Sequence, residues 1–269
     1  NRNKSFDKDS ELSVYHRIYN WFAKDLNVVL PDMPLTKFSY YYDESTLSNI
    51  KKIVRSFDTG IEDIEINNMS EEQLQNKIGI SLYKDVINEL KKNVQKQGQK
   101  LNLSMRSKKE FFNITMNDNY DLEIKTLCFK HGKSMLYFEF CEESDGTRRI
   151  FDFLDILFNK NKNSVYVIDE MERSLHPNLF NRFIELLNEY QKQSNIQVIF
   201  TTHETSIMKQ DLFRRDQIWF IERNINNDSR IYSLDTFNER FDKKISKAYL
   251  EGRYGAIPQF KSLHINELE

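Results

Sequence analysis

The apolar positions change their spacing near residue 110, which divides the chain into a helical first part and a second part that alternates strands with helices. In the first part, apolar residues recur at helical spacing, which predicts three helices. These helices cover residues 10–26, 44–57 and 70–97, and a strand-like stretch covers 61–66. The last helix either packs on the body of the protein or protrudes as an arm that binds a partner.

After residue 110 the pattern predicts a β-meander followed by an α/β unit. The meander strands cover residues 111–116, 120–129 and 135–140, and the later elements are helices over 146–158 and 178–193 with strands over 165–168, 197–201, 217–222 and 230–234. Helices that alternate with buried strands favour a parallel sheet with right-handed crossovers. The predicted fold class is therefore α/β, with a mainly helical region over 1–109 and a second region over 110–269.

Composition supports a globular chain and narrows its chemistry. The 269 residues are 39% hydrophobic and 13% aromatic, which is enough to build a core. The formal net charge of −2 gives no overall electrostatic reason to bind nucleic acid, although local basic patches are compatible with it. No apolar stretch approaches the ~20 residues of a membrane span, so we expect a cytoplasmic protein with no membrane partner. Cys128 and Cys141 lack metal-ligand spacing and are expected to be buried free thiols.

The most informative segment is the apolar run from Val165 to Ile168, which ends in Asp169 and Glu170. A strand buried on both faces places its last residues at the carboxyl edge of a parallel sheet, where α/β proteins hold their ligands. This is the pattern of a Walker B strand, in which Asp169 helps to hold Mg²⁺ and Glu170 orients or activates the water that attacks a γ-phosphate. The alternative is a strand followed by an acidic helix N-terminus.

A second candidate site lies at the start of the predicted helix over 146–158. Ser144 is placed to cap this helix, and Gly146 allows a ligand to approach the backbone closely. The exposed N–H groups and the helix dipole favour an anion, and Arg148 offsets the acidic residues nearby. The alternative is a capped helix that begins in an acidic loop and binds nothing.

Ser174 and His176 follow the Asp-Glu pair, and Pro177 begins the next predicted helix. His176 has no second ligand at metal-binding spacing, so the sequence favours an interface residue over a metal ligand. A turn residue with no function is the alternative for this histidine.

His203 leaves the strand over 197–201 at the same sheet edge as Asp169. There its ring could donate a hydrogen bond to a γ-phosphate and sense its presence. Considered without its neighbours, His203 would more often be a structural residue.

In this order the segments resemble the signature motif, Walker B strand, D-loop and H-switch of ABC-type ATPases. With Arg214–Phe220 and Tyr249–Pro258 behind them, the chain is similar to the AAA-annotated, ABC/SMC-like ATPases of bacterial phage-defence and abortive-infection systems. The resemblance runs from about Phe57 to Pro258 and is most specific from Ser144 to Phe220.

This resemblance implies an ABC/SMC-like P-loop NTPase core that uses ATP and Mg²⁺ and forms a head-to-tail homodimer or higher oligomer on ATP. It implies that Ser144 and Gly146, with Arg148 nearby, close over the γ-phosphate of a nucleotide held by a second subunit. Ser174 and His176 would then lie at that interface. It also implies a separately encoded effector, such as a nuclease, as a partner, and a phage trigger.

The sequence departs from the family in one respect, because it contains no P-loop. The one Gly-Lys-Ser, beginning at Gly132, has Leu127 where the first glycine should stand and precedes a predicted strand instead of a helix. We therefore interpret it as a hairpin turn and the chain as the C-terminal portion of a longer ATPase. Two alternatives remain open, a non-catalytic scaffold that binds an effector or phage protein, and an SMC-like DNA repair ATPase.

Overall fold

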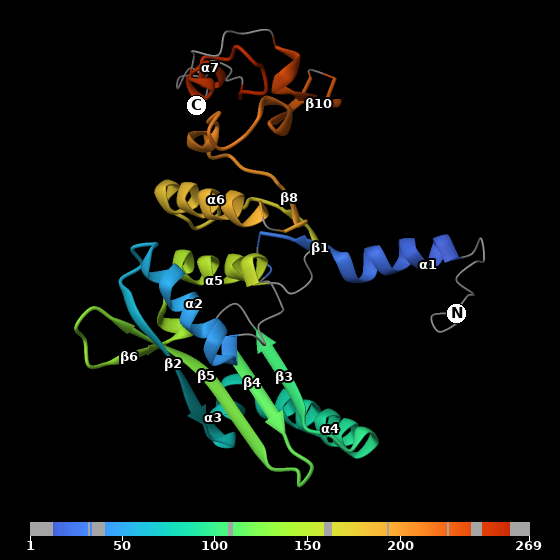
Figure 1. Ribbon diagram of the computed structural model, residues 1–269, viewed down its shortest axis with the longest axis vertical. Helices are drawn as coiled ribbons and strands as arrows, with labels where there is room; N and C mark the ends of the chain where they lie inside the picture. Colours follow the sequence, from blue (N-terminus) through green and yellow to red (C-terminus); the bar gives the residue numbers. More distant parts are fainter. Residues whose placement is uncertain are drawn as a thin grey trace, which may run out of the picture.

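The computed structural model shows an elongated molecule built in three tiers (Figure 1). An antiparallel sheet with two helices forms one end, a small parallel sheet with two helices lies in the middle, and a hairpin with a short helix forms the other end. The structure describes residues 13–31, 33, 41–106, 110–158, 163–192, 194–224, 226–237 and 244–258.

The middle tier is a three-stranded parallel sheet in the order β1-β7-β8. Its strands are β1 (Leu26–Val29), β7 (Val165–Ile168) and β8 (Gln197–Phe200). The helix α5 (Asp145–Phe158) precedes β7, and α6 (Pro177–Gln191) connects β7 to β8. The predicted parallel sheet and its crossover helix are therefore present.

Strand β1 was not predicted, and the helix predicted over 10–26 is shorter than expected. It consists of α1 (Ser13–Asn20) and a π-helical turn, η1 (Trp21–Asp25), after which the chain enters β1 at Leu26. Residues 10–12 of the predicted helix lie outside the described residues. Pairing with β7 overrides the helical periodicity, because the parallel ladder satisfies the backbone groups of Leu26–Val29.

The parallel sheet differs between its two faces. On one face, Val29, Tyr166 and Ile168 are buried in the main core together with Phe153, on α5, and Phe180, on α6. The other face, which we call the open face, alternates with the first along each strand. It consists of Leu26, Val28, Val165, Val167, Gln197 and Ile199.

The lower tier is an antiparallel sheet in the order β2-β5-β4-β3, with β6 paired to β5. Its strands are β2 (Ile61–Met69), β3 (Leu101–Arg106), β4 (Phe111–Met116), β5 (Leu122–His131) and β6 (Tyr137–Glu139). The predicted meander is confirmed, and Gly132 lies in the turn between β5 and β6, as expected for a hairpin. Strand β3 was not predicted, although it pairs with β4 along its whole length.

Helices cover both faces of this sheet. The helices α3 (Glu71–Ile78) and α4 (Ile80–Gln97) pack through Leu74 and Leu90 on one face, against Ile114 of β4. On the other face, α2 (Glu44–Arg55) packs with α5 on Phe111. The helix predicted over 70–97 is therefore two helices. Gly79 separates them because its backbone, at φ 84° and ψ 148°, cannot continue a helix.

The upper tier follows β8. Its elements are the hairpin strands β9 (Trp219–Arg223) and β10 (Ser229–Ser233) and the helix α7 (Ile245–Leu250). They share a small core that includes Phe220, Leu234 and Tyr254. Within the described ranges, no helix is long and apolar enough to cross a membrane.

Candidate functional site

The Asp-Glu pair lies where β7 leaves the parallel sheet, and hydrogen bonds to β1 and to the residue after β8 fix its position. The Asp169 amide donates a hydrogen bond to the Val29 carbonyl at 3.0 Å, which ties it to β1. The Thr201 hydroxyl, just after β8, donates to Asp169 Oδ1 at 2.5 Å and accepts from the Glu170 amide at 2.9 Å. One hydroxyl therefore orients both acidic residues at the carboxyl edge of the sheet.

Glu170 has an unusual backbone conformation. Its φ of +45° lies in the left-handed region, which non-glycine residues seldom adopt. The Met171 amide bonds to the Thr201 carbonyl at 3.1 Å and helps to hold this turn. Such strain is concentrated at functional sites, where the surrounding structure holds a side chain in a particular direction.

A second contact joins the loop after β7 to the loop after β8. The His203 amide donates a hydrogen bond to Glu172 Oε1 at 2.8 Å, while the other carboxylate oxygen, Oε2, is buried. The His203 side chain is exposed at this edge. Sequence reasoning missed both Glu172 and Thr201. The sequence shows Glu172 shortly after the Asp-Glu pair, but it does not show that Glu172 bonds to His203, 31 positions away.

The loop before α5 forms a compact N-cap around Ser144. Its hydroxyl accepts a hydrogen bond from the Thr147 amide at 3.0 Å and lies 2.8 Å from the Thr147 hydroxyl. Arg148 turns back onto the same loop, donating to the Cys141 carbonyl at 3.1 Å and pairing with Asp145. The guanidinium therefore already neutralises one of the acidic residues beside the predicted anion site.

Gly146 brings this loop into contact with the turn after β7. A Cβ at position 146 would lie 2.7 Å from the carbonyl oxygen of Ser174, too close for any side chain. Ser174 itself has a φ of +65°. Gly146 thus allows two backbones to meet, and in this chain the neighbour that occupies the space is Ser174.

His176 serves as the N-cap of α6. Its Nδ1 accepts a hydrogen bond from the Asn178 amide at 3.2 Å, with Pro177 in the first turn of the helix. The side chain is exposed. The structure therefore gives His176 a capping role and leaves its ring accessible.

The predicted residues form two groups. Asp169, Glu170 and His203 follow β7 and β8 and are joined by the contacts of Thr201 and Glu172. Ser144 and Ser174 come together at Gly146. Arg148 and His176 are bound within their own loops.

The helix behind the Ser144 loop carries a buried ion pair. Arg106 Nη2 lies 2.9 Å from Asp152 Oδ1, and both side chains are almost fully buried. Burial raises the pKa of Asp152, although the Arg106 guanidinium acts in the opposite direction. The pair fixes α5 to β3 and thus connects the Ser144 loop to the lower tier.

Two other clusters lie outside this region. Glu110, Glu139 and Cys141 are close enough to hold a metal ion, but the Lys77 ammonium lies 3.0 Å from Glu110 and 2.6 Å from Glu139. Burial lowers the pKa of Lys77, but the hydrogen bonds and negative charges of Glu139 and Glu110 together outweigh burial and raise it. The lysine therefore already supplies the positive charge. Cys141 is half-buried and Cys128 buried, both as free thiols.

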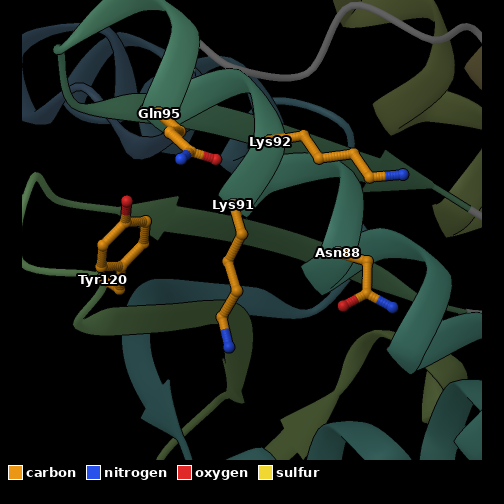
Figure 2. Close-up of a pocket in the computed structure, with 5 residues that line it drawn as sticks. All are labelled: Asn88, Lys91, Lys92, Gln95 and Tyr120. Atoms are coloured by element: carbon orange, nitrogen blue, oxygen red, sulfur yellow. The ribbon is translucent and has the colours of Figure 1, made fainter.

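The other cluster lines a shallow groove beside α4. Figure 2 shows its side chains, four from α4 and one from the turn before β5. They are Asn88, Lys91, Lys92, Gln95 and Tyr120. The groove belongs to the lower tier and contains none of the residues predicted to bind ATP.

Comparison with known proteins identifies the family. A family model described as "AAA domain, putative AbiEii toxin, Type IV TA system" matches residues 8–209. A comparison with curated proteins gives no match. The match covers the parallel sheet, the Asp-Glu pair and His203. An AAA domain implies the use of a nucleotide, typically with Mg²⁺. The chain therefore belongs to this AAA-domain family, which makes it an ATPase-like protein of the toxin–antitoxin and abortive-infection type.

Proposed function

We propose that this chain is the part of an ABC-like ATPase that positions the metal, the attacking water and the γ-phosphate. The observation that carries the proposal is the Thr201 hydroxyl, which orients Asp169 and Glu170 together at the carboxyl ends of parallel strands. Open α/β sheets bind ligands at this edge. The chain belongs to an AAA-domain family, and such domains use nucleotides, so we assign this arrangement to ATP hydrolysis.

The residues present fit Mg²⁺. Asp169 is exposed and offers a hard carboxylate oxygen, and Mg²⁺ in nucleotide sites takes one or two carboxylates, several waters and phosphate oxygens. Bound Mg²⁺ would neutralise charge on the phosphates. The Thr201 hydroxyl donates to Oδ1 of Asp169, so Oδ2 is the oxygen that would ligate the metal ion.

Glu170 is the proposed general base. Its backbone adopts the left-handed conformation directly after β7, and the residue is only half-buried. From there its carboxylate orients a water molecule and accepts its proton. His203, held through its amide by Glu172, donates a hydrogen bond to the γ-phosphate.

The Ser144 group acts on a nucleotide held by a second copy. The N-terminus of α5 carries backbone N–H groups and the positive end of the helix dipole, which suit a phosphate. Arg148 offsets the charge of Asp145 in this loop, and Ser174 lies beside the loop at Gly146. His176 follows Ser174 in the sequence and is assigned to the same interface. The contact at Gly146 makes the Ser144 loop and the Ser174 turn a single surface.

The proposal requires a phosphate-binding loop from polypeptide outside the printed sequence. None of the seven glycines stands in a Gly-x-x-x-x-Gly-Lys-Ser/Thr pattern. Hydrolysis is therefore to be measured on the protein as its gene encodes it.

The test is ATP hydrolysis by that protein and its Glu170→Gln variant. Loss of a general base lowers kcat by ~100-fold or more, while Mg·ATP binding is retained. Glu189→Gln, an exposed glutamate on α6, is the matched control and keeps full turnover. Unchanged turnover in Glu170→Gln contradicts the assignment.

We further propose that the ATP-bound state controls a separately encoded effector. The support is the family's toxin–antitoxin and abortive-infection type. Binding of the effector is then expected to differ between ATP-bound and nucleotide-free protein. Effector binding that is indifferent to nucleotide supports a non-catalytic scaffold instead.

A further inference from the structure

Three segments that lie far apart in the sequence meet at His131, the last residue of β5. The Gly132 amide donates a hydrogen bond to the Gly60 carbonyl at 3.2 Å, which joins the turn after β5 to the turn before β2. A Cβ at position 60 would lie 3.3 Å from His131 Nδ1, so Gly60 leaves room for the imidazole. The φ angle is positive at both glycines and also at Asp58, which is not a glycine. The third segment is the loop that carries Glu143.

His131 holds this loop through the carboxylate of Glu143. The imidazole Nε2 lies 2.7 Å from Glu143 Oε1. The Glu143 side chain is 3% exposed and the His131 side chain 31% exposed, so the carboxylate is the buried member of the pair. The Phe138 ring packs edge-on against the imidazole, with the ring centroids 5.3 Å apart. Because a buried carboxylate that loses its hydrogen-bond partner is costly, the contact with His131 keeps Glu143 in place.

Glu143 directly precedes Ser144, the cap of α5. The Glu143 carbonyl accepts a hydrogen bond from the Arg148 guanidinium, and the Ser144 carbonyl accepts one from the Arg148 amide at 3.0 Å. Glu143 is therefore held twice, by its side chain to β5 and by its backbone to α5. The Ser144 hydroxyl and the first N–H groups of α5 follow without an intervening residue. Their position thus depends on the contact between His131 and Glu143.

We propose that His131 is a positioning residue for the Ser144 loop and acts on it through Glu143. The inference rests on the proposed role of that loop, which is to contact a nucleotide held by a second copy. Without the imidazole, the Glu143 carboxylate turns outward to water and moves the adjoining N–H groups of α5 away from the phosphate. A displacement of ~1 Å in a positioning group can weaken its effect by ~100-fold. The antiparallel sheet thus contributes to the ATP-dependent contact through a residue that does not itself touch the nucleotide.

The test is dimerisation of the protein as its gene encodes it, with Mg²⁺ and a non-hydrolysable ATP analogue, by light scattering over a range of concentrations. His131→Ala should raise the dimer Kd by at least ~10-fold, while the affinity of a single protomer for the analogue stays unchanged. His131→Gln keeps a side-chain N–H that can donate to Glu143 and should restore most of the loss. Lys130→Ala is the matched control, because Lys130 is the neighbouring residue of β5 and its side chain has no hydrogen bond or ion pair among the described residues.

Further variants separate positioning from a merely structural role. Glu143→Ala should cause the same loss as His131→Ala, and the double variant should lose no more than either single variant, because both remove one contact. If His131→Ala lowers the free energy of unfolding in urea but leaves the dimer Kd unchanged, the proposal is overturned. Should Ser144→Ala weaken the dimer in that case, the proposed role of the Ser144 loop still stands. If the analogue produces no wild-type dimer, or if Ser144→Ala leaves the dimer Kd unchanged, the proposed role of the loop fails and this inference fails with it.

Discussion

The antiparallel and parallel sheets of this protein show how differently a scaffold and a chemical site are built. All six residues of β4 are buried, because helices cover both faces of the antiparallel sheet. In the parallel sheet one face is open, and the acidic residues and His203 gather at its carboxyl edge. Buried apolar packing on both faces dominates the first sheet. The second depends on polar contacts between the loops that follow its strands.

The largest expected effect comes from removing packed atoms in the two sheets. Ile114→Ala, in β4, removes a side chain that is fully buried and should lower the free energy of unfolding by about 3 kcal/mol. Val28→Ala, on the open face, should lower it by less than ~0.5 kcal/mol. Urea unfolding measures both. If both variants lost the same unfolding free energy, the two sheets would not differ in how much their side chains contribute to stability.

The next effect concerns the polar contacts of the parallel sheet. Thr201→Val keeps the side-chain shape but removes the hydroxyl that contacts Asp169 and the Glu170 amide. We expect a loss of about 1.5 kcal/mol in unfolding free energy, since one hydrogen bond involves a charged group. Thr201→Ser keeps the hydroxyl and serves as the control. A Thr201→Val chain as stable as wild type would show that the contact does not organise this edge.

A smaller effect is expected at Gly146. Alanine normally stabilises a helix by about 1 kcal/mol relative to glycine, but here its Cβ would clash with the Ser174 carbonyl at 2.7 Å. Overpacking against backbone typically costs about 1–3 kcal/mol, so Gly146→Ala should be destabilising by about 1 kcal/mol overall. Urea unfolding measures whether Gly146→Ala raises or lowers the free energy of unfolding. A more stable variant would mean that the two loops separate freely.

The smallest effect involves an ion pair on the scaffold. Lys51 Nζ lies 2.7 Å from Asp63 Oδ1, and this hydrogen bond holds the pKa of Asp63 below its usual value of 3.8. The folded pKa is depressed, so the stabilisation is present above pH 3.8 and is lost as the pH falls through the lower value. Because the pair is partly exposed, Asp63→Asn should remove less than ~0.5 kcal/mol at pH 7 and flatten the acid limb of the stability curve. An unchanged acid limb would show that the pair contributes nothing.

Much of the fold follows from local pattern. The alternating pattern of Phe111–Met116 and the helical periodicity of Asp145–Phe158 predict β4 and α5, because each element buries its own side chains. The pattern fails for β1, whose four residues follow a helix directly with no turn residue between them. It also fails for β3, which exists because β4 is available to pair with it.

The candidate site was predictable where its residues adjoin in sequence. Asp169 and Glu170 end a buried run, and Ser144 precedes a helix, so each could be recognised from its neighbours. Thr201 and Glu172 could not, because their importance lies in contacts between loops 31–32 positions apart. The role of Gly146 was predicted as access for a ligand. The structure adds a backbone neighbour, Ser174, that no spacing rule indicates.

The contact between Gly146 and Ser174 also bears on how this protein can change over evolutionary time. A substitution at position 146 is tolerable only after the turn at Ser174 has moved away, and that turn holds a residue with positive φ. Substitutions at Gly146 are therefore expected to accompany changes in the Ser174 turn. Among homologues we expect a side chain at the position of Gly146 only where the Ser174 turn has a different length or conformation.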